Sequence, residues 1–126
     1  MRRALTVAEK IGYESLKAEA LSGVTAAMAQ TCDREGLMRV LAISEKIDVE
    51  RSKAKVLSAV AEAMGQAGDR EGLRQVLEAA EEIEDVRNKA DVLGGVAEAM
   101  GQAGDREGVL AVARRALEAA EEIEDE

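Results

Sequence analysis

The sequence predicts an all-α protein made of stacked helical hairpins, and two observations carry this prediction. The 126 residues include no Pro, Trp or Phe and a single Tyr, while good helix formers such as Ala, Glu and Leu are abundant. The chain also repeats itself at a spacing of 36 residues. Because one helical hairpin cannot bury both of its faces, repeated hairpins are expected to stack into an α-solenoid.

The repeat is visible in identical residues at equivalent positions. The segment 60–72 recurs unchanged as 96–108, and 77–85 recurs 40 positions later as 117–125. The last unit therefore has four extra residues, about one helical turn, and its second helix is expected to lengthen while roughly keeping its apolar face. Residues that recur every 36 positions include Met28, Met64 and Met100, Leu21, Leu57 and Leu93, Gln30, Gln66 and Gln102, and Asp33, Asp69 and Asp105.

The repeat divides the chain into parts of one domain with about seven helices. Residues 4–11 resemble 40–47, which is the second half of a unit whose first half is missing. The predicted parts are an orphan helix at 1–14 and three hairpins at 15–50, 51–86 and 87–126.

Each unit is expected to contain two amphipathic helices. In the second unit, apolar residues fall at i, i+3, i+4 and i+7 twice, first as Leu57, Val60, Ala61 and Met64 and then as Leu73, Val76, Leu77 and Ala80.

Polar residues and glycines mark the predicted helix ends. Asp33, Asp69 and Asp105 are predicted to cap the second helices. Gly68 and Gly104 are predicted to end the first helices in the left-handed conformation. The predicted caps of the first helices are Ser15, Ser52 and Asn88.

One pattern in the second unit consists of Leu57, Val60, Ala61 and Met64, then residues 67–69, then Leu77 and Ala80. This pattern resembles a tetratricopeptide repeat, and the resemblance covers nearly the whole chain. This resemblance implies a right-handed superhelix of hairpins whose first helices line a concave binding groove. The chain departs from the family in its 36-residue period and in the absence of proline between units. The family's small residue early in the second helix is replaced by Leu37, Leu73 and Val109. HEAT-like and other arrays of helical hairpins stay open as alternatives.

The helical rotation indicates the same surface independently of the family. At 100° per residue, Lys55, Glu62 and Gln66 point about 140–180° away from the core residue Leu57. With the equivalent and flanking positions of the other units, the predicted partner-binding residues are Glu19, Ser22, Ala26, Gln30, Lys55, Ser58, Glu62, Gly65, Gln66, Asp91, Gly94, Glu98, Gly101 and Gln102. Gly65 and Gly101 lie inside predicted helices, where glycine indicates close approach by a neighbouring helix or by a ligand.

The charge distribution excludes several classes of function. The net charge is −9, to which the residues up to Lys55 contribute +2 and the residues after it contribute −11. We expect no nucleic-acid partner, because there is no basic stripe with aromatic residues, and no membrane partner. Cys32 is the single cysteine, which excludes an internal disulfide, and a cytoplasmic location is expected. Its repeat position is held by Gly68 and Gly104, so Cys32 is interpreted as a substitution and not as a site.

No catalytic, cofactor-binding or metal-binding residues are predicted. The chain has no His to act as a base for Cys32, and no phosphate-binding loop or zinc spacing occurs. The acidic runs 81–85 and 121–126 are interpreted as solvated helix ends. The function expected is that of a protein-interaction scaffold, not an enzyme, which binds a protein or peptide with basic residues. The alternative is a structural spacer, or a fragment of a longer array that self-assembles into homo-oligomers through its end faces.

Overall fold

The computed structural model describes residues 2–9, 14–31 and 33–125, and all secondary structure in these ranges is helical. The predicted all-α class is therefore confirmed. Cys32 lies outside the described residues. Its interpretation as a substitution therefore stays a prediction from its repeat position. The seven helices are α1 (Arg2–Glu9), α2 (Glu14–Thr31), α3 (Arg34–Glu45), α4 (Glu50–Ala67), α5 (Arg70–Glu81), α6 (Val86–Gln102) and α7 (Arg106–Asp125).

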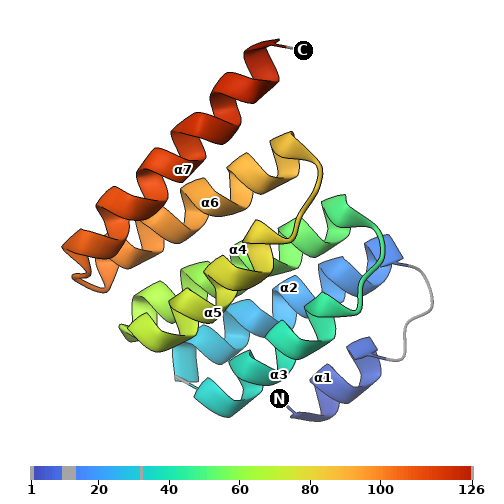
Figure 1. Cartoon of the computed structure of the whole chain (residues 1–126). Helices are drawn as coiled ribbons and strands as arrows, with labels where there is room; N and C mark the ends of the chain where they lie inside the picture. Colours follow the sequence, from blue (N-terminus) through green and yellow to red (C-terminus); the bar gives the residue numbers. More distant parts are fainter. Residues whose placement is uncertain (1, 10–13, 32, 126) are drawn as a thin grey trace.

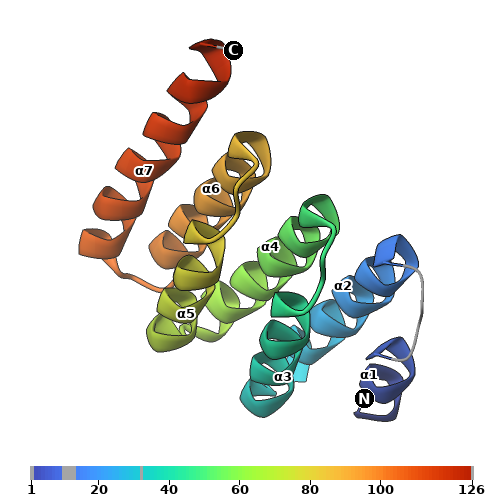
Figure 2. The ribbon, with the colours of Figure 1, turned by 45° about the vertical axis from the view of Figure 1, so that its right-hand side comes forward.

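The helices α1 to α6 form two rows (Figures 1 and 2). The first helices of the three units, α2, α4 and α6, lie side by side, so that α4 packs against both α2 and α6. The second row contains α1, α3 and α5; α3 packs between α2 and α4, and α5 packs between α4 and α6. The first helices thus contact one another directly, and the second helices pack between them on one side.

The core lies between the two rows and is built from the repeated apolar residues. Leu57, Val60, Ala61 and Met64 of α4 are all fully buried, as are Leu73, Val76 and Ala80 of α5. The predicted apolar stripes of both helices of the second unit are therefore confirmed, except that Leu77 is only half-buried.

The second helices begin as predicted. The N–H of Gly36 donates to Asp33 Oδ1 (3.0 Å), and the N–H of Gly72 donates to Asp69 Oδ1 (2.9 Å). Asp105 accepts the equivalent bond from Gly108 at 3.0 Å. These carboxylates satisfy backbone donors that a helix leaves free at its first turn.

Both predicted left-handed glycines are also confirmed. The φ angle of Gly68 is 70° and that of Gly104 is 79°. This backbone conformation costs a residue with a side chain about 1–2 kcal/mol, which explains glycine at these positions.

The predicted caps of the first helices are wrong for Ser52 and Asn88. The helices α4 and α6 begin at Glu50 and Val86, so both residues lie inside the first turn. Asp85 caps α6 instead, because its Oδ1 accepts the N–H groups of Arg87 (2.9 Å) and Asn88 (3.2 Å). Val49 precedes α4 and makes no side-chain cap. Ser15, the third predicted cap, likewise lies within a helix, α2.

The last helix is lengthened by its four extra residues as predicted, and it also continues past Glu121, the counterpart of the residue at which α5 ends. Residues 77–85 and 117–125 have the same sequence, yet α5 ends at Glu81 whereas α7 continues to Asp125. In the earlier copy Ile83 is buried, and Asp85 turns away to cap α6. In the later copy the backbone stays helical as far as Asp125.

The apolar face of α7 is not kept as expected. Figure 2 shows α7 at the end of the row formed by α2, α4 and α6 rather than next to α5. It packs along α6 and makes no close backbone contact with α5 within the described residues. Four extra residues rotate the second part of the helix by about 40° relative to α5. Consequently Leu117, the counterpart of half-buried Leu77, is 60% exposed.

None of the described helices is both long enough and apolar enough to cross a membrane.

Candidate interaction surface

The row of first helices presents a polar surface on the side away from the second helices, which we call the first-helix face. Its residues were predicted from helical rotation, and all nine residues of the predicted stripe are exposed. They are Glu19, Ala26 and Gln30 of α2, Lys55, Glu62 and Gln66 of α4, and Asp91, Glu98 and Gln102 of α6.

Three hollows lie along this face. The largest, about 680 Å³, spans the three first helices near their N-terminal ends and includes Glu19, Lys55, Ser58 and Asp91 in its lining. A second hollow of about 380 Å³ lies between α4 and α6. A third, of about 310 Å³, lies between α2 and α4. Eleven of the fourteen predicted residues line these hollows, namely Glu19, Ser22, Ala26, Gln30, Lys55, Ser58, Glu62, Gln66, Asp91, Glu98 and Gln102.

The three predicted glycines do not line the hollows. Gly65 is buried, and a Cβ built on it would lie 2.8 Å from the Cβ of Ala99 in α6. It is therefore a packing residue between neighbouring first helices. Gly94 is exposed with no atom within 4 Å of a built Cβ, and a Cβ on Gly101 would meet only Val109, at 3.7 Å. Close approach thus explains Gly65 but not Gly94 or Gly101.

The charge of the face differs between hollows. The hollow between α4 and α6 is lined by the carboxylates of Glu62, Asp91 and Glu98 and by no basic residue. The largest hollow is mixed, because Arg51 and Lys55 line it together with Glu19 and Asp91. Negative charge is therefore concentrated at the α4–α6 end of the face.

Several residues of the largest hollow were missed from the sequence. Arg51, Asn88, Val49, Ala18 and Ala54 also line it. They lie near the beginnings of α2, α4 and α6. Val49 and Arg51 precede the wrongly predicted cap Ser52, whereas Ala18 and Ala54 lie inside the predicted helices and outside the predicted stripe. The sequence signal for these residues was the equivalent repeat position of Ser52 and Asn88. This position was interpreted as a helix cap and not as part of an interaction surface.

The third hollow contains an unusual polar group. The hydroxyl oxygen of Ser22 is buried and has no hydrogen-bond partner among the described residues. Ala26, Gln30, Glu62 and Gln66 surround it in the lining of this hollow. Buried polar groups are usually paired, so this hydroxyl is available to a hydrogen-bonding group that enters the hollow.

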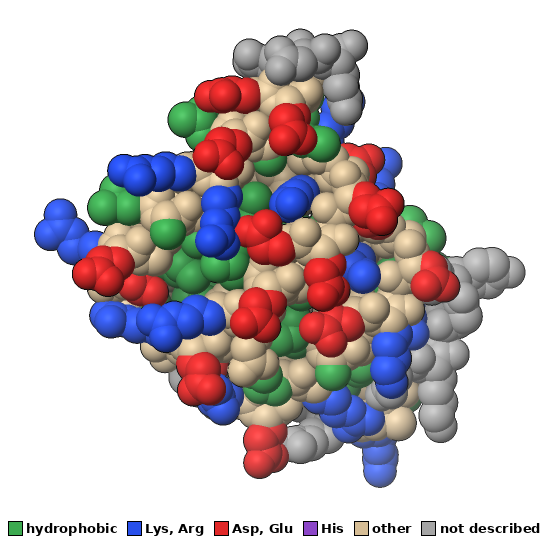
Figure 3. Space-filling model, in the orientation of Figure 1, with side chains coloured by type: hydrophobic (Ala, Val, Ile, Leu, Met, Phe, Trp, Pro, Cys, Tyr) green, Lys and Arg blue, Asp and Glu red, His purple; other side chains and the backbone are tan. Residues whose placement is uncertain are grey.

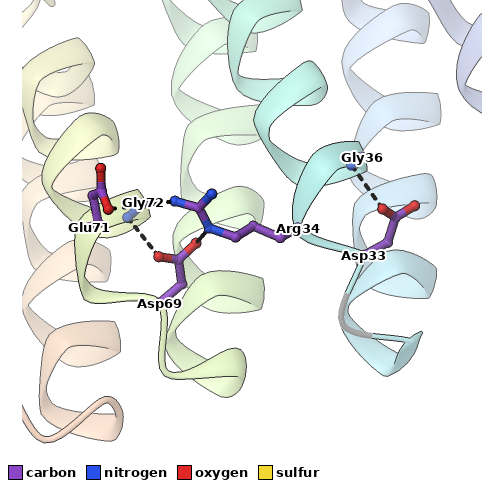
Figure 4. A network of polar contacts seen from close by, with 6 residues as sticks. All are labelled: Asp33, Arg34, Gly36, Asp69, Glu71 and Gly72. Atoms are coloured by element: carbon purple, nitrogen blue, oxygen red, sulfur yellow. Dashed lines mark hydrogen bonds and ion pairs between the residues drawn. The ribbon is translucent and has the colours of Figure 1, made fainter.

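Polar contacts join consecutive units. Figure 4 shows Arg34 of α3 reaching Asp69, the capping residue of α5: Nε donates to Oδ2 at 2.9 Å. The guanidinium also lies 3.9 Å from Glu71. One unit later, Arg70 donates instead to the carbonyl oxygens of Ala103 (3.1 Å) and Gly104 (2.9 Å).

A third contact of this kind involves Glu50 at the beginning of α4. Its two carboxylate oxygens accept the N–H groups of Glu84 and Asp85, each at 2.9 Å. Glu50 thereby holds the loop from which α6 begins. The repeat position equivalent to Glu50 in the third unit is Val86, which has no side-chain oxygen with which to hold a further unit.

On the opposite side of the molecule the described residues carry charges of both signs. Figure 3 shows Lys, Arg, Asp and Glu side chains interspersed over this side, where α3 and α5 lie in front of the first helices. In the ranges the structure describes, no group of three or more His, Cys, Asp and Glu residues is placed to hold a metal ion.

Comparisons with protein-family models, with curated protein sequences and with solved structures gave no match for this chain. The class of the protein therefore rests on its fold, which is an all-α arrangement of seven described helices.

Proposed function

We propose that this protein is a tetratricopeptide-like interaction scaffold that binds a protein or peptide segment along its first-helix face. The observation that carries the proposal is the row of three hollows, lined by residues from the same repeat positions of successive first helices. A repeated surface of this kind suits an extended or helical segment, which presents its own groups at regular spacing.

The proposed tetratricopeptide-like geometry is supported by the order of helix packing. Each first helix packs against the next first helix, and α3 and α5 each pack between two consecutive first helices. Leu37 and Leu73 depart from the family pattern, and both are buried in the core.

The charge of the face favours a partner with Lys or Arg. Among the charged residues of the predicted stripe, Glu19, Glu62, Asp91 and Glu98 outnumber Lys55. The stripe offers no aromatic or Arg side chain of the kind that usually makes interfaces tight. We therefore propose weak, salt-sensitive binding that a longer array or several linked sites would strengthen.

The test compares two double variants with the same change of charge. Glu62→Lys with Glu98→Lys reverses the acidic hollow, whereas Glu45→Lys with Glu78→Lys places the same charges at exposed positions of the second helices. A partner captured from the source organism's lysate would then be titrated against each protein by calorimetry at low salt.

We expect the first pair to weaken binding and the control pair to leave it unchanged, with similar thermal midpoints for both. Equal affinity of the two double variants would reject the first-helix face as the binding site.

A further inference from the structure

One side of α2 is uncovered, although the same side of α4 and of α6 is covered. Val24 of α2 is half-buried, whereas its repeat counterparts Val60 and Val96 are fully buried. Ala20 is half-buried as well, and the valines at its repeat position in α4 and α6 are fully buried. Because valine stands at the first of these positions in all three helices, the difference in burial comes from the neighbouring helix.

The contrast is larger toward both ends of α2. Ala27 is exposed, whereas Ala63 and Ala99 are each 2% exposed. Leu16 is 52% exposed, whereas Ser52 at its repeat position is 8% exposed. These positions of α2 are spaced at i, i+4, i+8 and i+11, which places them on one side of the helix. We call this side the outer face of α2, and its residues are Leu16, Ala20, Val24 and Ala27.

The helix α1 shows the same contrast at the same end of the molecule. Val7 is 61% exposed, whereas its repeat counterparts Ile43 and Ala79 are each 5% exposed. Figure 2 shows α1 and α2 together at one end of the two rows of helices. The uncovered positions of α1 and α2 therefore belong to one end of the array.

The later units show what covers this side of a first helix. A Cβ built on Gly65 of α4 would lie 2.8 Å from the Cβ of Ala99 in α6, and a Cβ built on Gly95 would lie 4.0 Å from Ser58 Oγ. The later residue of α4 meets the later residue of α6, so the two helices run parallel. The cover of this side of α6 is thus a parallel helix that presents two small residues seven positions apart.

We propose that the outer face of α2 binds an amphipathic helix of a partner protein, which runs parallel to α2 and presents small residues seven positions apart. The repeat counterparts of Gly95 and Ala99 in α2 are Gly23 and Ala27, and both are exposed. No atom lies within 4 Å of a Cβ built on Gly23, so its backbone is open to close approach by a helix. Small residues on both helices allow the two backbones to pack closely.

Leu16 adds apolar area to this face. Its repeat counterparts, Ser52 and Asn88, are polar, so a helix that covers α2 would bury a larger apolar side chain at this position than the later units bury. None of the residues of the outer face belongs to the stripe of the first-helix face. The inference is therefore independent of the proposed function, and each can fail without the other.

The probe is a synthetic peptide with the sequence of residues 50–67, which is the helix α4. A chemical cross-link between the positions of Lys55 and Glu62 holds the peptide helical, because short isolated helices are marginal in water. Both positions lie on the side that faces away from the core, so the cross-link leaves the packing side free. Amide chemical shifts of the full-length labelled chain should change along the outer face of α2, with a dissociation constant on the order of 0.1 mM.

Two substitutions test the contact from its two sides. A Gly65→Leu peptide should bind roughly tenfold more weakly or worse, because the large side chain keeps the helices apart. In the chain, Ala27→Arg should abolish binding of the original peptide. Ala113→Arg is the matched control, since Ala113 is an exposed alanine of α7, and it should bind like the original chain. Circular dichroism should show equal helicity for both arginine variants.

Three results would overturn the proposal. The first is the absence of shift changes on the outer face at about 1 mM peptide, including changes confined to the first-helix face or to α7. The second is equal binding of the two peptides, or of the Ala27 and Ala113 variants. The third is self-association of the chain that Ala27→Arg abolishes, because the outer face would then bind a second copy instead of a partner helix.

Discussion

Gly65 of α4 and Ala99 of α6 pack against each other so closely that a side chain on the glycine has no room. A Cβ on Gly65 would lie 2.8 Å from the Cβ of Ala99 and 2.9 Å from its Cα and its carbonyl oxygen. Two of these three atoms belong to the backbone, so a rotamer change cannot relieve the overlap. The two helices would have to separate.

We therefore predict that Gly65→Ala destabilises the protein by about 1–3 kcal/mol, the usual range for an overfilled core. Gly101→Ala is the matched control, since Gly101 holds the same repeat position and its built Cβ meets only Val109, at 3.7 Å. There the higher helix propensity of alanine should stabilise by about 0.5–1 kcal/mol. Urea denaturation of both variants measures the difference, and changes of the same sign would contradict this account of the α4–α6 contact.

Leu57→Ala should destabilise by about 2–5 kcal/mol, because it leaves a cavity in the centre of the core. Leu57 is 0% exposed, whereas Leu117 is 60% exposed, so Leu117→Ala serves as the control with the same chemical change. At micromolar protein concentration the control should shift the denaturation midpoint very little. A small effect at Leu57 would mean that α4 does not depend on this face for its packing.

The carboxylate of Asp69 contributes to stability in two ways, because it caps α5 and also accepts a hydrogen bond from Arg34. Asp69→Ala removes both the cap of α5 and the acceptor for Arg34, and should cost about 1–2 kcal/mol. Arg34→Ala removes only the ion pair, and because the Arg34 side chain is 55% exposed it should cost at most about 1 kcal/mol. A double-mutant cycle measures the coupling free energy between Arg34 and Asp69. A coupling free energy of zero would show that the ion pair does not stabilise the contact between these two units.

The carboxylate of Glu50 accepts two backbone N–H groups of the next unit, so Glu50→Ala should destabilise by about 1 kcal/mol. Hydrogen exchange at Glu84 and Asp85 should accelerate at the same time, since these amides lose their acceptor. Glu62→Ala, an exposed position on the same helix, is the control for loss of charge and should leave both amides unchanged. Unchanged exchange in the Glu50 variant would contradict the proposed role of this residue in holding α6.

Much of the fold could be predicted because its information is local. The spacing of Leu57, Val60 and Met64 identifies a helix and its buried side within three turns of chain, and the structure buries all three. The caps Asp69 and Asp105 were predictable for the same reason, since each bonds to an amide three residues later. The stripe of exposed polar residues was then predictable from helical rotation alone.

The remaining features depend on neighbours that a local pattern does not reveal. The side chain of Glu50 accepts a hydrogen bond from the backbone N–H of Glu84, which lies 34 residues away in the sequence. Neither residue has a local pattern that indicates this contact. Ile83 and Ile123 lie in identical nine-residue segments, but only Ile83 is fully buried, because another unit packs beyond it. The exposure of Leu117 likewise depends on how the whole of α7 packs along α6, which the repeated segment alone does not reveal.

Across the described residues, no helix packs against another that is more than two places away along the chain. Folding therefore never has to close a long loop, and the entropy lost in forming each contact stays small. Proteins of this kind, with low contact order, fold in microseconds to milliseconds. The central helix α4, which touches α2, α3, α5 and α6, is accordingly the place where we expect a folding nucleus to form, and from which structure would spread toward both ends.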